Sequence, residues 1–188
     1  MPASKSPGPT DDNTPADHAA DHQPPAPPEH PVDLHVATSP CSGRYSQVIK
    51  AITSEMFIAA PVATVWALTV DVESWPRITP ATVTSVELLQ PGAVALGSSA
   101  RIKQPGQREK VWTVTEFEHL RLFAWSAASL GLTMTGRHEL VEADGGVRNV
   151  LTIDLSGPLA RLVAALGGRL IRRTITTENE CFKAAAEH

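Results

Sequence analysis

The sequence predicts an α+β domain over residues 45–188, in which a curved antiparallel sheet of seven strands wraps around one long C-terminal helix. Three observations support this prediction. Short strand-like segments follow one another with turn residues between them, which favours antiparallel pairing. Apolar residues alternate along several of these segments, as in a sheet with one buried face. The last segment carries apolar residues three or four positions apart, which is typical of a helix.

The other elements are expected before that helix. A first strand is expected over residues 47–58. Pro61 then suits the first turn of a short helix, because proline has a helical φ and an N–H at this position would find no acceptor within the helix. A second short helix is expected over 72–78, ending before Pro80. Six more strands are expected at 82–90, 98–104, 109–117, 121–129, 132–142 and 147–155.

The long helix is expected to begin at Pro158. The residues assigned to its apolar stripe are Leu159, Leu162, Val163, Leu166, Leu170, Thr174, Thr177, Cys181 and Ala184. Gly167 and Gly168 interrupt this stripe, and a glycine weakens a helix by about 1 kcal/mol relative to alanine. We therefore expect a kink at this pair, or a close approach to a strand or a ligand.

Residues 1–44 differ in composition and are expected to form a disordered tail rich in Pro, Ala, Asp and His. Ten of the sixteen prolines precede Cys41, and this segment offers little apolar surface to bury. Four of the seven histidines lie in it, but their irregular spacing fixes no metal geometry. We expect a solvated tail.

Charge and cysteine content exclude several classes of function. The first 45 residues carry two basic and six acidic side chains, and the remainder carries fourteen of each. A neutral domain with an acidic tail has no electrostatic reason to bind nucleic acid. The two cysteines lie far apart and form neither a zinc motif nor a disulfide framework, although a single Cys41–Cys181 bridge stays open. We expect no metal and no cofactor.

The sequence also bears on location. The N-terminus lacks the apolar core of a signal peptide, and the most apolar stretch, 56–70, is interrupted by Pro61. We therefore expect a soluble cytoplasmic protein with no integral membrane segment. A protein partner cannot be named from the sequence.

Strand alternation predicts which side chains face the concave side of the sheet. Ile102 and Gln104 share one face of the 98–104 strand. Trp125 lies on the apolar face of the 121–129 strand, and Met134 and His138 share a face of the 132–142 strand. Buried polar groups need a partner, and a few of them in an apolar cavity are what orients a small molecule. His138 and Gln104 are thus candidate ligand contacts, with satisfied core residues as the alternative.

Several segments together resemble the START-like (SRPBCC) superfamily of polyketide cyclase/dehydrase and lipid-transport type. Residues 54–66 match its opening of a strand, Ala-Pro and a helix containing Val-Trp. The other matching segments are Glu73-Ser74-Trp75-Pro76, Trp112-Thr113-Val114-Thr115-Glu116-Phe117, Phe123-Ala124-Trp125 and Leu155-Ser156-Gly157-Pro158-Leu159. The resemblance covers residues 48–187 and implies a helix-grip fold, in which the sheet grips the C-terminal helix over an apolar pocket.

The resemblance adds site residues. It favours Trp112 facing inward, where alternation alone leaves the 109–117 strand ambiguous, and it implies that Trp75 lies near the pocket mouth. The predicted ligand-binding residues are Trp75, Ile102, Gln104, Trp112, Trp125, Met134, His138, Leu166 and Leu170.

The leading hypothesis is a protein that binds a small hydrophobic ligand, such as a polyketide, a lipid or an aromatic metabolite. An alternative is a polyketide cyclase or dehydratase in which His138 is the general acid/base, because an unperturbed histidine titrates near neutral pH. A third hypothesis is a regulatory interaction module that uses the acidic tail or the arginines between Arg161 and Arg173. The fold hosts several functions, so the resemblance alone does not choose among them.

Overall fold

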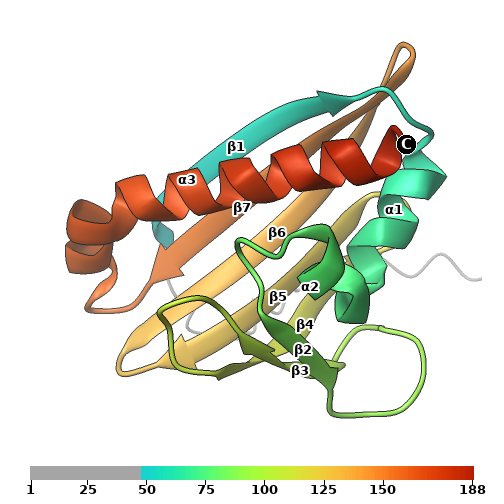
Figure 1. Cartoon of the computed structure of the whole chain (residues 1–188). Helices are drawn as coiled ribbons and strands as arrows, with labels where there is room; N and C mark the ends of the chain where they lie inside the picture. Colours follow the sequence, from blue (N-terminus) through green and yellow to red (C-terminus); the bar gives the residue numbers. More distant parts are fainter. Residues whose placement is uncertain (1–47) are drawn as a thin grey trace, which may run out of the picture. The chain divides into compact units, whose positions relative to one another are not determined.

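One seven-stranded antiparallel sheet and a long helix dominate the part of the chain that the structure, a computed structural model, describes, which is residues 48–188 (Figure 1). The strand order is β1-β7-β6-β5-β4-β3-β2, so each strand after β1 pairs with its neighbour in sequence and β7 closes back onto β1. The predicted α+β fold is confirmed. The predicted tail, residues 1–44, and Cys41 lie outside the described residues.

The strands agree closely with the sequence prediction. Their bounds are β1 Val48–Ile58, β2 Ser85–Leu88, β3 Ser99–Lys103, β4 Lys110–Glu118, β5 Leu122–Ser129, β6 Leu132–Ala143 and β7 Gly146–Ser156. Only β2 is much shorter than predicted. Its neighbouring segment 89–98 contains Pro91 and two glycines with positive φ, Gly92 and Gly97, which end the ladder and reverse the chain.

Two short helical segments connect β1 to β2. Helix α1 (Val62–Val70) begins directly after Pro61 and buries Val65, Trp66 and Thr69. The second predicted helix is a 3₁₀ turn, η1 (Val72–Ser74), which continues into α2 (Trp75–Ile78). This short turn buries the indole of Trp75. The indole N–H donates a hydrogen bond to the carbonyl oxygen of Leu68 at 3.1 Å.

Helix α3 (Ala160–Ala186) lies across the concave face of the sheet, over β1 and β7 (Figure 1). Its buried residues are Ala160, Ile175, Glu178, Asn179 and Phe182. The apolar stripe predicted from the sequence is therefore wrong, because its leucines at 159, 162, 166 and 170 are exposed. Helix α3 carries a second stripe that includes Ile171, Ile175 and Phe182, and this second stripe packs on the sheet.

The glycine pair in α3 does not interrupt the helix, which is continuous over Ala160–Ala186. A side chain at Gly167 would meet no other atom within 4 Å. A Cβ at Gly168 would touch Ile52 at 3.7 Å, which is ordinary contact. Neither position therefore needs a glycine to make room, and the predicted kink stays a prediction.

Buried amides fix the middle of α3 on the sheet. Asn149 of β7 donates a hydrogen bond to Asn179 of α3 at 3.0 Å. The amide nitrogen of Asn179 donates in turn to the carbonyl oxygens of Ser54 at 3.2 Å and of Asn149 at 3.3 Å. Because a buried amide without partners is costly, this network specifies one register of helix against sheet.

An irregularity in β4 settles the orientation of Trp112. The pairing of β4 with β5 shifts between Val114 and Glu116, which leaves Thr115 as an extra residue. Such a β-bulge resets the alternation of side chains. Trp112 and Val114 are therefore buried before the bulge, and Phe117 packs against the same core cluster after it.

Candidate functional site

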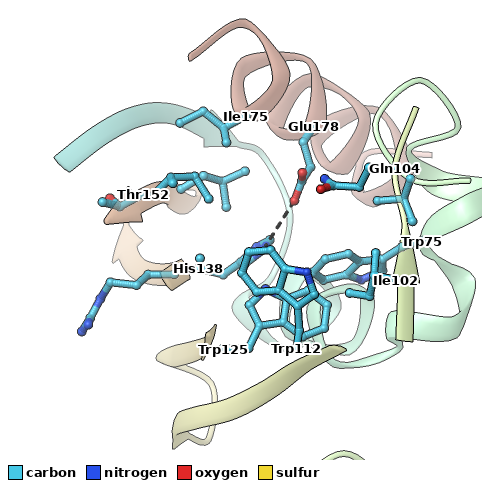
Figure 2. A pocket seen from close by; sticks show the side chains of 14 residues that line it. Trp75, Ile102, Gln104, Trp112, Trp125, His138, Thr152, Ile175 and Glu178 are labelled. Carbon is cyan, nitrogen blue, oxygen red and sulfur yellow. Dashed lines mark ion pairs between the residues drawn. The ribbon is translucent and has the colours of Figure 1, made fainter. Parts of the chain in front are cut away.

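A small cavity lies between the concave face of the sheet and α3 (Figure 2). Its volume is about 50 Å³. A buried water needs about 10–15 Å³, so this space holds a few waters, whereas pockets for drug-sized molecules measure about 300–1,000 Å³. The residues that line it are Trp75, Val83, Ile102, Gln104, Trp112, Trp125, Gly136, Arg137, His138, Leu151, Thr152, Ile153, Ile175 and Glu178.

Three tryptophans from three different elements form one wall of the cavity (Figure 2). The ring centres of Trp75 and Trp125 are 5.0 Å apart, and those of Trp112 and Trp125 are 5.7 Å apart. Offset and edge-to-face aromatic pairs at these distances add about 0.5–1.5 kcal/mol each to the burial of the rings. The wall is apolar, and its rings are inclined to one another, by 70° for Trp75 and Trp125 and by 43° for Trp112 and Trp125.

Gly136 in β6 makes room for this wall. A Cβ at this position would lie 3.1 Å from the indole nitrogen of Trp125 and 3.3 Å from its neighbouring ring carbon. Gly136 pairs with Trp125 across the ladder and with Ile153 on the other side. A side chain here would displace the indole, so Gly136 allows Trp125 to lie close to the strand.

His138 and Glu178 bring the polar chemistry into the cavity. The Nε2 atom of His138 on β6 lies 3.5 Å from Oε1 of Glu178 on α3, and both side chains are buried (Figure 2). The imidazole is surrounded by aromatic rings, with its centre 5.1 Å from that of Trp75 and 5.5 Å from that of Phe182. An acid and a base thus face each other in an apolar environment.

Burial moves the pKa values of this pair in opposite directions. It lowers the pKa of His138 from 6.5 to about 3, because desolvation disfavours the imidazolium. The same effect raises the pKa of Glu178 from 4.5 to about 7, because it disfavours the carboxylate. Near neutral pH the carboxyl group therefore titrates and the imidazole is neutral, whereas the sequence prediction assigned titration near neutrality to His138.

One nitrogen of the pair has no partner. The Nδ1 atom of His138 is buried and makes no hydrogen bond within the described part of the chain. A buried polar atom left unpaired costs about 1–3 kcal/mol, and such an atom in a native protein commonly serves a ligand or a water. The pair can donate or accept a proton through Glu178 and present a hydrogen-bonding nitrogen through His138.

Six of the nine predicted ligand-binding residues line this cavity: Trp75, Ile102, Gln104, Trp112, Trp125 and His138. Met134 does not line it and packs, half-buried, between the two hydrophobic clusters of the core. The expectation that Leu166 and Leu170 line the cavity is corrected, because both are exposed on α3.

Glu178 is the residue of the site that sequence reasoning missed. It was missed because the stripe assigned to α3 follows the leucines and does not include Glu178. The signal was present in the spacing of Ile171, Ile175, Glu178 and Phe182, which recur every three or four residues. A carboxylate inside an apolar stripe indicates a buried partner, and here that partner is His138.

Metal sites and membrane-spanning helices are both missing from the described residues. Within 48–188, no three His, Cys, Asp or Glu side chains are grouped so that they could hold a metal ion. In the same part of the chain, no helix is long and apolar enough to cross a membrane.

Known structures share this fold at low sequence identity. The protein TTHA0849 from Thermus thermophilus matches with a TM-score of 0.59 and 16% identity over 73% of this chain and 97% of that protein. Zhui aromatase/cyclase from Streptomyces sp. R1128 matches with a TM-score of 0.53 and 18% identity over 70% of this chain and 93% of that one. The di-domain aromatase/cyclase StfQ, from the steffimycin biosynthetic pathway, matches with a TM-score of 0.59 and 12% identity over 73% of this chain and 50% of its own length.

A profile match to the sequence shows the family. No curated protein matches the sequence. The profile described as "Polyketide cyclase / dehydrase and lipid transport" matches residues 50–187, which covers the sheet, both short helices and α3. The chain therefore belongs to the polyketide cyclase/dehydrase and lipid transport family.

Proposed function

We propose that the protein binds a small, largely apolar molecule that carries a carbonyl or hydroxyl oxygen. The observation that carries this proposal is the His138–Glu178 pair, which is buried in a cavity walled by tryptophans. The tryptophans contribute apolar burial at about 25 cal/mol per Å². His138 and Gln104 orient the oxygen of the ligand, since a few polar groups in an apolar pocket determine which molecule fits.

The small volume of the cavity gives the proposal a structural consequence. A ring-containing ligand does not fit into about 50 Å³, so binding must widen the space between α3 and the sheet. Gln104 lies at the end of β3, beside the loop that leads to β4, and can move more freely than the tryptophans. Ligand binding is therefore coupled to a local movement of this loop or of α3.

The proposal is tested with two probes of similar shape, 2-naphthol and naphthalene, by the rise in melting temperature of the full chain. We expect 2-naphthol to bind about fivefold more tightly, which corresponds to one hydrogen bond of about 1 kcal/mol. His138→Leu should remove this preference and leave naphthalene binding in place. His119→Leu serves as the control, since His119 does not line the cavity. If neither probe raises the melting temperature, the proposed pocket is wrong.

A second candidate function is catalysis of a polyketide cyclisation or dehydration. The specific observation in its favour is that burial raises the pKa of Glu178 to about 7, which suits proton transfer near neutral pH. In this version Glu178 is the general acid/base and His138 positions its carboxyl group. Replacing Glu178 with Gln separates the two candidates, because an enzyme loses turnover and keeps binding, whereas a binding protein has no turnover to lose.

The remaining expectations stay predictions. A regulatory role through a protein partner would require a partner that binds the α3 arginines or the acidic tail. The absence of nucleic-acid binding and a cytoplasmic location also rest on the sequence alone.

A further inference from the structure

Five leucines on neighbouring elements are exposed at one end of the domain. Along α3 the exposed fractions are 40% for Leu159, 54% for Leu162, 81% for Leu166 and 69% for Leu170. These positions are three or four residues apart and lie on one face of the helix. The fifth is Leu130, which is 90% exposed in the turn between β5 and β6.

The turn and the helix meet at this end. A Cβ at Gly131 would lie 3.4 Å from the ring of Pro158, and one at Gly157 would lie 2.3 Å from the carbonyl oxygen of Gly131. Leu130, which precedes Gly131 in this turn, therefore lies near the beginning of α3. We call Leu130, Leu159, Leu162, Leu166 and Leu170 the leucine face. An exposed apolar surface built from two elements indicates an interaction site more strongly than scattered leucines do.

The same half of α3 is strongly basic. Its exposed arginines are Arg161, Arg169, Arg172 and Arg173. No acidic residue occurs between Gly157 and Thr177, whereas the last third of α3, from Glu178 onward, contains both signs of charge. On a helical projection, Arg173 lies among the leucines and Arg169 lies beside Leu162. Arg161 and Arg172 lie nearer the sheet, where Arg172 donates a hydrogen bond to the carbonyl oxygen of Thr53. The exposed side of α3 thus presents leucines with the positive charge of Arg169 and Arg173 beside them.

We propose that the leucine face and its arginines dock the protein on an anionic lipid bilayer surface. The leucines insert among the acyl chains at the interface, and the arginines contact the lipid phosphates. The helix lies along the surface, with its other face still packed on β1 and β7. This inference is independent of the proposed ligand and concerns where the protein acts.

A bilayer fits this face better than the two other occupants that the sequence offers. A second copy of the chain would bring Arg169 and Arg173 of both copies together, which like-charge repulsion opposes. The N-terminal 45 residues carry six acidic side chains, but their large apolar side chains are few: Met1, Val32, Leu34, Val36 and Tyr45. A membrane with anionic headgroups supplies negative charge and a continuous apolar phase together.

The test is sedimentation of the full chain with vesicles of phosphatidylcholine alone, or with about a third of phosphatidylglycerol. We expect binding to the anionic vesicles that weakens as salt is added. Arg169→Gln with Arg173→Gln should weaken this binding about 25-fold, at about fivefold for each charge. Leu166→Ser with Leu170→Ser should weaken it by at least about tenfold, because apolar burial is lost.

The matched control is Leu96→Ser, since Leu96 is 68% exposed in the segment between β2 and β3. All these side chains are exposed, so circular dichroism should show an unchanged fold. The proposal is overturned if binding does not increase with phosphatidylglycerol, or if the Leu166/Leu170 variant binds as the Leu96 variant does. It is also overturned if light scattering shows a dimer that dissociates in the Leu166/Leu170 variant, because the face would then join two copies.

Discussion

The buried carboxyl group of Glu178 makes the stability of the domain depend on pH, and replacing it with glutamine isolates that dependence. Burial raises its pKa from 4.5 to about 7 in the folded protein, whereas the unfolded chain keeps the ordinary value. A group with a raised folded pKa contributes stability that is fully present below its unfolded pKa and is lost as the pH rises through the folded pKa. Glutamine keeps the size of the side chain and cannot ionise.

The size of the effect follows from the pKa shift. Each pKa unit of difference corresponds to about 1.4 kcal/mol. As the pH rises from about 5 to about 8, ionisation of Glu178 therefore lowers the free energy of unfolding of the wild type by roughly 2–3 kcal/mol. The Glu178→Gln variant does not undergo this loss. The pH dependence that His138 gives to the free energy of unfolding has the opposite sign. Its pKa is lowered to about 3, so its contribution is present above 6.5 and is lost as the pH falls toward 3. Both proteins contain His138, and its contribution cancels in their difference.

The assay is urea unfolding of both proteins at about pH 5 and about pH 8, followed by the fluorescence of the four tryptophans. We expect the free energy of unfolding of Glu178→Gln, relative to wild type, to rise by roughly 2–3 kcal/mol between the two pH values. The control is Glu180→Gln, because Glu180 is exposed on the same helix. Parallel behaviour of the Glu178→Gln and Glu180→Gln variants would refute the raised pKa of Glu178 and with it the neutral acid–base pair.

Three further changes test the packing that holds the site. Asn179→Ala should lower the free energy of unfolding by about 2–4 kcal/mol, because it leaves the buried amide of Asn149 without its partner. Thr177→Ala is the control, and a loss no larger than that of the control would contradict the hydrogen-bond network. Gly146→Ala should cost about 3 kcal/mol, because its Cβ would lie 2.1 Å from the carbonyl oxygen of Ile58, and wild-type stability would show that β1 and β7 pair differently. Gly167→Ala should add about 0.5–1 kcal/mol in the same urea assay, and a loss would mean that α3 bends there.

The strands and turns could be predicted from the sequence because their signals are local. The turns at 90–92, 104–106 and 144–146 contain Pro-Gly or Gly-Gly, and the glycines at 92, 106 and 145 adopt positive φ in the structure. A residue with this conformation is most often glycine, so the sequence marks the ends of the strands directly. Antiparallel order follows, since short turns join strands that are neighbours.

The wall of the cavity was predictable only in part, because a β-bulge has no sequence signature of its own. In β4 the bulge at Thr115 places Trp112 and Phe117 on the same side of the sheet, although strict alternation puts them on opposite faces. Ile102 and His138 lie on strands that keep their alternation, so pattern alone assigned them to the cavity.

The acid–base pair was hidden because α3 has two apolar faces and only one of them can pack on the sheet. The longer row of leucines, which includes Leu166 and Leu170, lies on the exposed face, so choosing the most apolar stripe selects the wrong side. What decides the orientation is complementarity: Asn179 needs the buried Asn149, and Glu178 needs His138. These two polar residues of α3 match two polar residues on the apolar face of the sheet. If the helix packed its leucines on the sheet, Asn149 and His138 would lose these partners. Because the helix buries these polar residues and exposes its leucines, the proposed cavity and the proposed docking face lie on different sides of it and are tested separately.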